Sequence, residues 1–199
     1  MSEGGILAVS SRDNLIHLLE VLMINKKVSI RRRCFCRGHT APVQSLDFSL
    51  DGTYLMAADN SKELLFWQVE TGSRVNAVAL RDEVWYSWSS TLGWPVMGAA
   101  NLPQNAEIGN GLRFGDINCA IRSPDKTLLA VGSSQRQAIR LFPYPCLNDS
   151  IPKAYNGHSS PVVDIVFLQD SSNLSLSVVS AGGNDCCLFQ WKVLPKERN

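Results

Sequence analysis

The hexapeptide GHTAPV at residues 38–43 is the strongest indication of the fold class, because it returns as GHSSPV at residues 157–162. Both copies lead into residues that alternate between apolar and polar, which is the period-two pattern of a β-strand. Each then continues through a turn into a strand of small residues and a further strand that carries a tryptophan, Trp67 in the first unit and Trp191 in the second. An internal repeat of β-strands therefore organises the chain.

The repeated unit resembles a WD-repeat propeller blade, in which a Gly-His opening, a small-residue strand and a tryptophan-bearing strand recur about every 40 to 45 residues. Two weaker copies have Leu19 and Phe142 in the tryptophan place. The resemblance predicts an all-β fold of WD40-type blades. Its blocks are 1–37 (a partial blade with a basic outer strand), 38–80 (a blade), 81–115 (an aromatic-rich insertion or outer strands), 116–156 (a degenerate blade) and 157–199 (the C-terminal blade).

A buried hydrogen-bonded set is a further property that the WD-repeat resemblance implies. In that family an aspartate six residues before the tryptophan bonds to the Gly-His histidine, which is linked in turn to a strand Ser or Thr and to the tryptophan. In the C-terminal blade His158, Asp185 and Trp191 match this pattern. Ala181 stands in the expected Ser/Thr place, so we expect the set to be incomplete there.

The blade at residues 38–80 departs further from that pattern. It has the histidine, His39, and the tryptophan, Trp67, but Ser61 stands six residues before the tryptophan where aspartate is expected. We therefore expect a weaker buried set in this blade.

More specific motifs separate and follow the clear blades. They are the aromatic-rich stretch 81–98, then GDINCA at 115–120, LFPYPC at 141–146, YNGHSS at 155–160 and GGND at 182–185. In this order the motifs resemble the C-terminal end of the echinoderm microtubule-associated protein-like family, over the whole chain.

That resemblance implies a large protein in which two propellers pack in tandem, with this chain similar to the last part only. About three complete blades and a partial one would be present, whereas closed propellers usually have about 4 to 8. We therefore expect the chain alone to expose a sheet edge and apolar faces between blades. The implied function is non-enzymatic binding of tubulin, microtubules or cytoskeletal proteins in the cytoplasm. Many family members attach to microtubules through an N-terminal coiled coil and a basic stretch, neither of which is found in this sequence.

Composition excludes several classes of protein. The 199 residues are 45% hydrophobic and 19% charged, with a net charge of +1 and a mean hydropathy of −0.04, which is typical of a globular protein. Nucleic-acid binding is disfavoured because no chain-wide positive field exists. The sequence shows neither a secretory signal nor a membrane span, so we expect a cytosolic protein whose six cysteines are reduced thiols.

One local concentration of charge stands out at residues 26–37, where six cations occur without an intervening acid. A polyanion such as an acidic tubulin tail or RNA is one partner that this patch would attract. The alternative is an outer blade strand whose basic residues protect its edge from pairing. The six cations are Lys26, Lys27, Arg31, Arg32, Arg33 and Arg37.

The aromatic residues Trp85, Trp88 and Trp94 present a similar choice. They could anchor a partner protein, because tryptophan is enriched at the centres of interfaces. They could instead cover a gap between blades or between two propellers.

Enzymatic chemistry is poorly supported. His39 and His158 belong to the repeat, and His17 lies in a strand pattern, so no Ser/His/Asp set is expected. Cys34, Cys36 and His39 suggest zinc, but a structural zinc site needs four ligands. We expect no metal and no cofactor. A generic WD-repeat scaffold that does not bind tubulin is the alternative function, and a metalloprotein or hydrolase using these three residues is a third.

Overall fold

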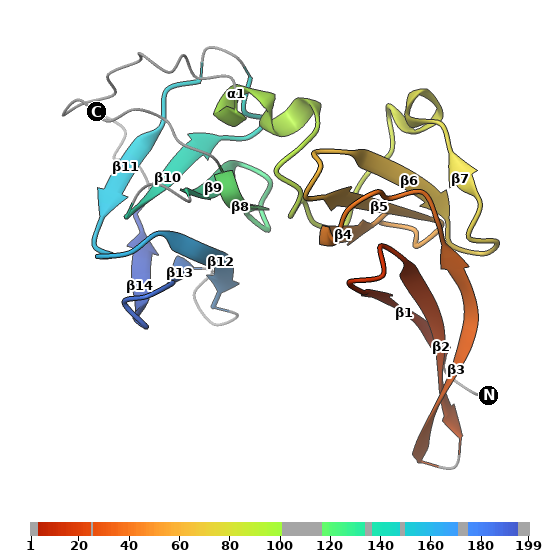
Figure 1. Cartoon of the computed structure of the whole chain (residues 1–199). Helices are drawn as coiled ribbons and strands as arrows, with labels where there is room; N and C mark the ends of the chain where they lie inside the picture. The colour runs from red at the N-terminus through yellow and green to blue at the C-terminus, as the bar shows by residue number, and fades with distance from the viewer. Residues whose placement is uncertain are drawn as a thin grey trace. The chain divides into compact units, whose positions relative to one another are not determined.

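The chain folds into antiparallel β-sheets, as the repeat predicts. The computed structural model describes residues 4–24, 26–100, 117–133, 137–147, 150–170 and 175–194. Fourteen strands in this described part form four separate sheets of three or four strands each (Figure 1). No helix within the described ranges has the length and apolarity that crossing a membrane would need.

The first sheet contains β1 (Gly4–Ser10), β2 (Ile16–Ile24) and β3 (Lys27–Cys36), in that order. The β2–β3 hairpin continues past the start of β1 and projects from the sheet (Figure 1). A bulge in the pairing of β2 with β3 leaves Arg33 without a register partner. Such a bulge bends an edge strand and increases its twist.

The second sheet is a complete four-stranded blade with β4 (Val43–Phe48), β5 (Tyr54–Asp59), β6 (Leu64–Gln68) and β7 (Arg74–Val75) in sequence order. The small residues of β5 allow it to be buried along its length, between two neighbouring strands. This order explains why the small-residue strand precedes the tryptophan-bearing strand in the sequence.

Side-chain hydrogen bonds fix the turn between β4 and β5. The Ser49 and Thr53 hydroxyls both donate to the carboxylate of Asp51, at 2.6 Å each. These bonds, that of Ser49 foremost, lower the pKa of Asp51 to about 2. After β7 comes the 3₁₀ helix η1 (Ala77–Leu80). Asn76 is its N-cap, and the Asn76 side chain accepts a hydrogen bond from the Val78 N–H in the first turn.

The third sheet is also a complete four-stranded blade. It contains β8 (Ile117–Arg122), β9 (Leu128–Ser133), β10 (Ala138–Pro143) and β11 (Lys153–Asn156). Ser123, Asp125 and Thr127 repeat the turn of the second sheet, with the hydroxyl of Ser123 donating to Asp125 at 2.5 Å.

Two short helical segments precede the third sheet, η2 (Trp94–Val96) and α1 (Met97–Ala100). The backbone of Cys146 clamps them, since its N–H donates to Pro95 and its carbonyl accepts from Gly98. A Cβ on Gly98 would stand 1.9 Å from the carbonyl oxygen of Leu147, so only glycine fits.

The fourth sheet has three strands, β12 (Val162–Gln169), β13 (Leu176–Gly182) and β14 (Leu188–Val193). Within the described residues β14 has no neighbour on its outer side, where the second and third sheets place β7 and β11. The open edge expected from the sequence is therefore present.

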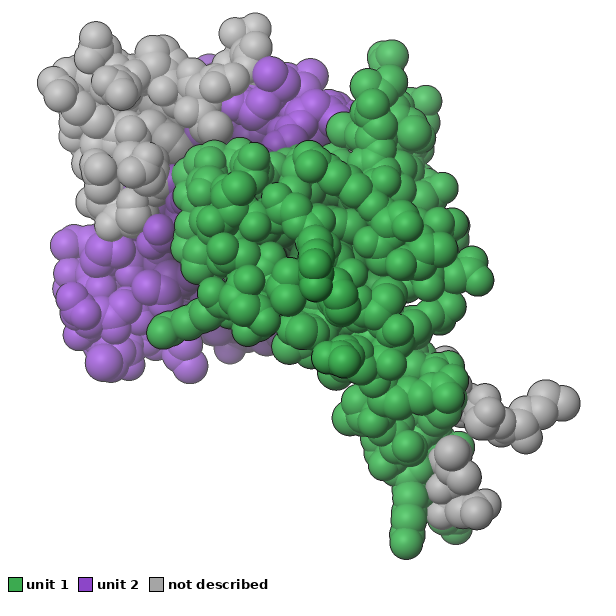
Figure 2. All heavy atoms as spheres, turned by 45° about the vertical axis from the view of Figure 1, so that its right-hand side comes forward, with its two compact units in different colours: residues 1–86 green, residues 87–199 purple. Residues whose placement is uncertain are grey.

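Two compact units divide the chain, residues 1–86 and 87–199, coloured separately in Figure 2. Each unit has a core where one sheet packs on the next. In the first unit the buried core residues are Ile16, Leu18, Cys36, Leu55, Ala57, Leu65, Trp67 and Val69. In the second unit they are Ala130, Ile139, Val162, Ile165, Phe167 and Val178.

Among the described residues nothing covers one apolar face of the first sheet, as expected. Leu7 pairs with Leu19 in the register in which Leu55 pairs with Trp67, so β1 and β2 correspond to β5 and β6. In the second sheet, the face that carries Leu55 and Trp67 packs against the first sheet. The corresponding face of the first sheet carries Leu7 and Leu19. In the first sheet Leu7 is 45% exposed and Val9 is 39% exposed.

Candidate interaction site

A buried hydrogen-bonded set holds the fourth sheet together. His158 Nδ1 lies 3.0 Å from the Asp185 carboxylate, and His158 Nε2 lies 2.8 Å from the Ser180 hydroxyl oxygen. The indole N–H of Trp191 donates to the same hydroxyl oxygen at 3.0 Å. An ionised aspartate requires the Nδ1–H tautomer, so Ser180 donates to Nε2 and accepts from the indole.

Ser180, and not Ala181, completes this set, so the prediction that alanine occupies the Ser/Thr place is wrong. Ser180 is fully buried, and Ala181 points to the opposite face because side chains alternate along a strand. Burial raises the pKa of Asp185, but hydrogen bonds from the Cys187 N–H and from His158 outweigh burial, and the net pKa is lowered.

The second sheet has a shorter version of the set. His39 Nδ1 lies 2.9 Å from Asp59, and both side chains are buried. Sequence spacing pointed to Ser61, but Asp59 fills the aspartate place from the end of β5, so the expectation that this blade lacks its aspartate is wrong. Burial raises the pKa of Asp59, whereas hydrogen bonds from the Glu63 N–H and from His39 lower it more strongly.

The hydroxyl is missing from this second set. Ala57 pairs with Leu65 in the register in which Ser180 pairs with Phe189, so alanine stands where serine completes the other blade. His39 Nε2 consequently has no hydrogen-bond partner among the described residues. The indole N–H of Trp67 donates instead to the carbonyl of Arg37 at 3.3 Å.

The third sheet has a phenylalanine at the tryptophan place. Phe142 pairs with Leu129 at the tryptophan place and is fully buried. Val131 occupies the register of the missing hydroxyl, opposite the buried Arg140.

The structure does not bring the suggested zinc ligands together. Among the described residues, ligand-type atoms gather at His39, Asp59 and Glu63, without Cys34 or Cys36. This cluster is the structural His–Asp pair just described, because both Asp59 oxygens already accept hydrogen bonds, from His39 and from the Glu63 N–H. Burial raises the pKa of the Cys36 thiol to about 12, so it packs as a protonated side chain.

The basic residues lie on or beside β3, and all six are exposed. Lys26 occupies the hairpin turn with a φ of 62°, and Arg37 follows the strand with its guanidinium 4.5 Å from the centre of the Phe35 ring. Glu20 on β2 accepts a hydrogen bond from Arg31 Nε. Spacing along the sequence could not reveal this acid, because it comes from the neighbouring strand.

The three tryptophans do not form one surface. Trp85 is buried, with its ring centre 5.7 Å from that of Phe66. Trp88 is also buried, and its carbonyl accepts a hydrogen bond from the Arg122 N–H. Trp94 is 56% exposed, so it is the one of the three that a partner could reach.

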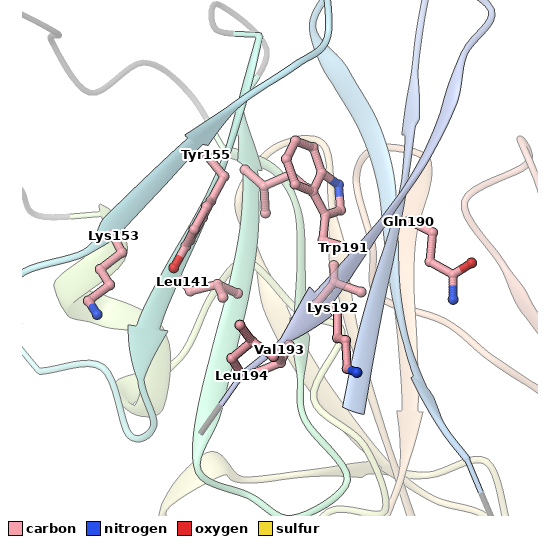
Figure 3. Close-up of a pocket in the computed structure, with 10 residues that line it drawn as sticks. Leu141, Lys153, Tyr155, Gln190, Trp191, Lys192, Val193 and Leu194 are labelled. Carbon is pink, nitrogen blue, oxygen red and sulfur yellow. The ribbon is translucent and has the colours of Figure 1, made fainter. Parts of the chain in front are cut away.

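An open pocket of about 540 Å³ lies along β14 (Figure 3). Its sides include Tyr155 from β11 and Trp191 from β14, whose ring centres are 6.4 Å apart. Trp191 is partly exposed, whereas Trp67 is fully buried in its four-stranded sheet. The pocket therefore marks the side of the fourth sheet that lacks an outer strand.

Comparison with known proteins agrees with this architecture. Residues 1–193 match the family of the echinoderm microtubule-associated protein second β-propeller. The chain is 33% identical to echinoderm microtubule-associated protein-like 4 of Mus musculus, over 98% of this chain and 18% of that protein. It is 36% identical to the 77 kDa echinoderm microtubule-associated protein of Lytechinus variegatus, over 96% of this chain and 27% of that protein.

A solved structure supports the fold independently. A chain of the mitotic checkpoint complex superposes with a TM-score of 0.62 at 14% identity, covering 96% of this chain and 59% of that one. The predicted all-β, WD40-type blades of a partial propeller are thus confirmed. The chain spans about a fifth to a quarter of the length of the relatives it matches, and it belongs to the echinoderm microtubule-associated protein family, within the region of the second β-propeller.

Proposed function

We propose that this chain is a non-enzymatic WD-repeat protein that binds microtubules or tubulin in the cytoplasm, through the exposed basic strand β3. Family membership supports the class of partner, since its relatives are named as microtubule-associated proteins. Binding here means rigid presentation of a surface, and no chemical step is involved.

The observation that carries the proposal is the concentration of cations on β3 and its flanks. Six exposed cations lie within residues 26–37, and the described structure places one acid, Glu20, in an ion pair with them. Charges this close act together, because the Debye length is about 8 Å at physiological salt. An acidic partner surface would be attracted and oriented by this field.

The buried sets support rigid presentation. The His158–Ser180–Trp191 chain of hydrogen bonds joins β13 to β14, and the His39–Asp59 pair joins the segment before β4 to β5. Networks of this kind hold a blade in one conformation. A surface that does not rearrange loses less conformational entropy when it binds.

Co-sedimentation of the purified chain with polymerised tubulin tests the proposal. The test variant carries Lys27→Glu, Arg32→Glu and Arg33→Glu. Its matched control reverses three exposed cations elsewhere, Arg12, Lys153 and Lys192. We expect the test variant to lose pelleting and the control to retain it.

Failure of the unaltered chain to pellet at any salt concentration would contradict microtubule binding. The generic scaffold would then become the favoured function. Equal loss in both variants would show instead that overall charge matters and not β3.

A further inference from the structure

The outer edge of β3 is open. β3 is ten residues long and pairs only with β2 in the described structure. The turn at Gly72 covers the far end of the strand, where a Cβ would stand 2.9 Å from the Phe35 carbonyl oxygen. The outward-facing backbone groups between Lys27 and Arg33 have no ladder partner there, and such an edge is a template for another strand.

The two faces of this edge differ in chemistry. Side chains alternate along the strand, so Lys27, Ser29 and Arg31 lie on one face. Val28, Ile30 and Arg32 lie on the other face, where Val28 and Ile30 are 60% and 56% exposed. Apolar side chains on a protected edge strand are unusual, because charge alone would suffice to prevent pairing.

We propose that β3 binds an extended segment of a partner protein as an added strand, in which acidic and apolar residues alternate. An added strand has the same period of two as β3, so its acidic side chains would face Lys27 and Arg31 while its apolar ones cover Val28 and Ile30. This proposal adds the chemistry of the partner segment to the proposed function. It rests on the proposed function only for the location of the contact, at β3.

The geometry favours a strand over other anionic partners. A purely acidic tail would meet the cations but would leave Val28 and Ile30 exposed. An anionic lipid surface could contact the cations and the apolar side chains. It has no backbone N–H and C=O groups that could pair with those of the open edge. A strand supplies charge, apolar contact and ladder hydrogen bonds together, as in other cases of strand addition.

Three fluorescent peptides of equal length test this, titrated by anisotropy at about 0.15 M salt. In the first, Glu and Val alternate over about eight residues, close to the usual length of a strand. The second has the same side chains with its backbone amides N-methylated, so it cannot donate ladder hydrogen bonds. The third contains Glu alone.

We expect the alternating peptide to bind at least about tenfold more tightly than either of the others. Lys27→Glu with Arg31→Glu should weaken it by about tenfold or more, since cross-strand attraction becomes repulsion. The matched control, Arg12→Glu with Lys192→Glu, should change the affinity less than about twofold. Because Lys192 lies on β14, this control also tests binding at the open edge of that strand.

Equal binding of the alternating and Glu-only peptides would overturn the inference, as would a loss confined to the control variant, which would place the peptide on β14. The outcome is separable from that of the proposed function. A chain that pellets with microtubules but shows no preference for the alternating peptide retains the function and loses this inference. A chain that prefers the peptide without pelleting does the reverse.

Discussion

Completing the unfinished buried set of the second sheet should stabilise the protein. Ala57→Ser places a hydroxyl at the register position that Ser180 occupies in the fourth sheet. There it can donate to His39 Nε2, which has no partner among the described residues, and can accept from the indole of Trp67 in place of the Arg37 carbonyl. The substitution adds one oxygen atom at a position where the fourth sheet already has the hydroxyl of Ser180.

The expected gain follows from the one added bond, to His39 Nε2, and the cost of burying a hydroxyl, because the indole bond would only replace the one to Arg37. Pairing a buried, unsatisfied acceptor contributes about 2 kcal/mol, and burial of the hydroxyl costs about 1 kcal/mol where its bonds are made. The unfolding free energy should therefore rise by about 1 kcal/mol. For a chain of this size that corresponds to roughly 2–4 °C in the unfolding temperature.

Thermal and urea unfolding of Ala57→Ser and of its neighbour, Ala58→Ser, make the matched comparison. Ala58 is equally buried but points to the other face, away from the set, so its hydroxyl should lower the unfolding free energy by about 1–3 kcal/mol. In a Trp67→Phe background the gain at position 57 should persist, because it comes from the bond to His39 Nε2 and not from the indole. Equal destabilisation by the two serines would show that position 57 does not lie within the hydrogen-bonded set.

Three further outcomes are expected. Neighbouring hydroxyls lower the pKa of Asp51 to about 2 in the folded protein. The stability that Asp51 contributes is therefore present above its unfolded pKa of about 3.9 and is lost as the pH falls toward 2. Asp51→Asn should flatten this part of an acid-unfolding curve. Gly72→Ala should lower the unfolding free energy by about 1–3 kcal/mol in urea titrations, since φ is +70° and a Cβ would press on the Phe35 carbonyl. In mass-spectrometric alkylation the exposed Cys186 should react in the folded protein, while the buried Cys36, with its pKa raised to about 12, should react only after unfolding.

Much of the architecture could be predicted because the blade repeats. The period-two patterns located the strands around both Gly-His motifs, and Phe142 could be placed by analogy with the two tryptophans. A repeat transfers information from a clear copy to a degenerate one, and this made the partial blades recognisable.

The errors arose where a residue count stands in for register. Neighbouring strand residues point to opposite faces, so an offset of one exchanged Ser180 for Ala181. The shorter β5–β6 connection moves the aspartate to Asp59 at the end of the strand, where counting back from Trp67 misses it.

Contacts between strands were also beyond reach from the sequence. Glu20 pairs with Arg31 from the adjacent strand, and no local pattern of charge indicates this. The sequence Ser-x-Asp-x-Thr at 49–53 and 123–127 forms the same turn in the second and third sheets. This repeated motif could have marked residues 116–156 as a blade, in addition to the Phe142 position.

Hydrogen–deuterium exchange of the whole chain, with and without polymerised tubulin, tests whether β3 contacts the microtubule. If β3 is the contact strand, the outward-facing amides of residues 27–33 should exchange at least about tenfold more slowly with microtubules present, because newly paired edge amides become protected. The amides of β14, residues 188–193, should be unchanged. Unaltered exchange at 27–33 in a microtubule-bound chain, or protection confined to β14, would contradict the account.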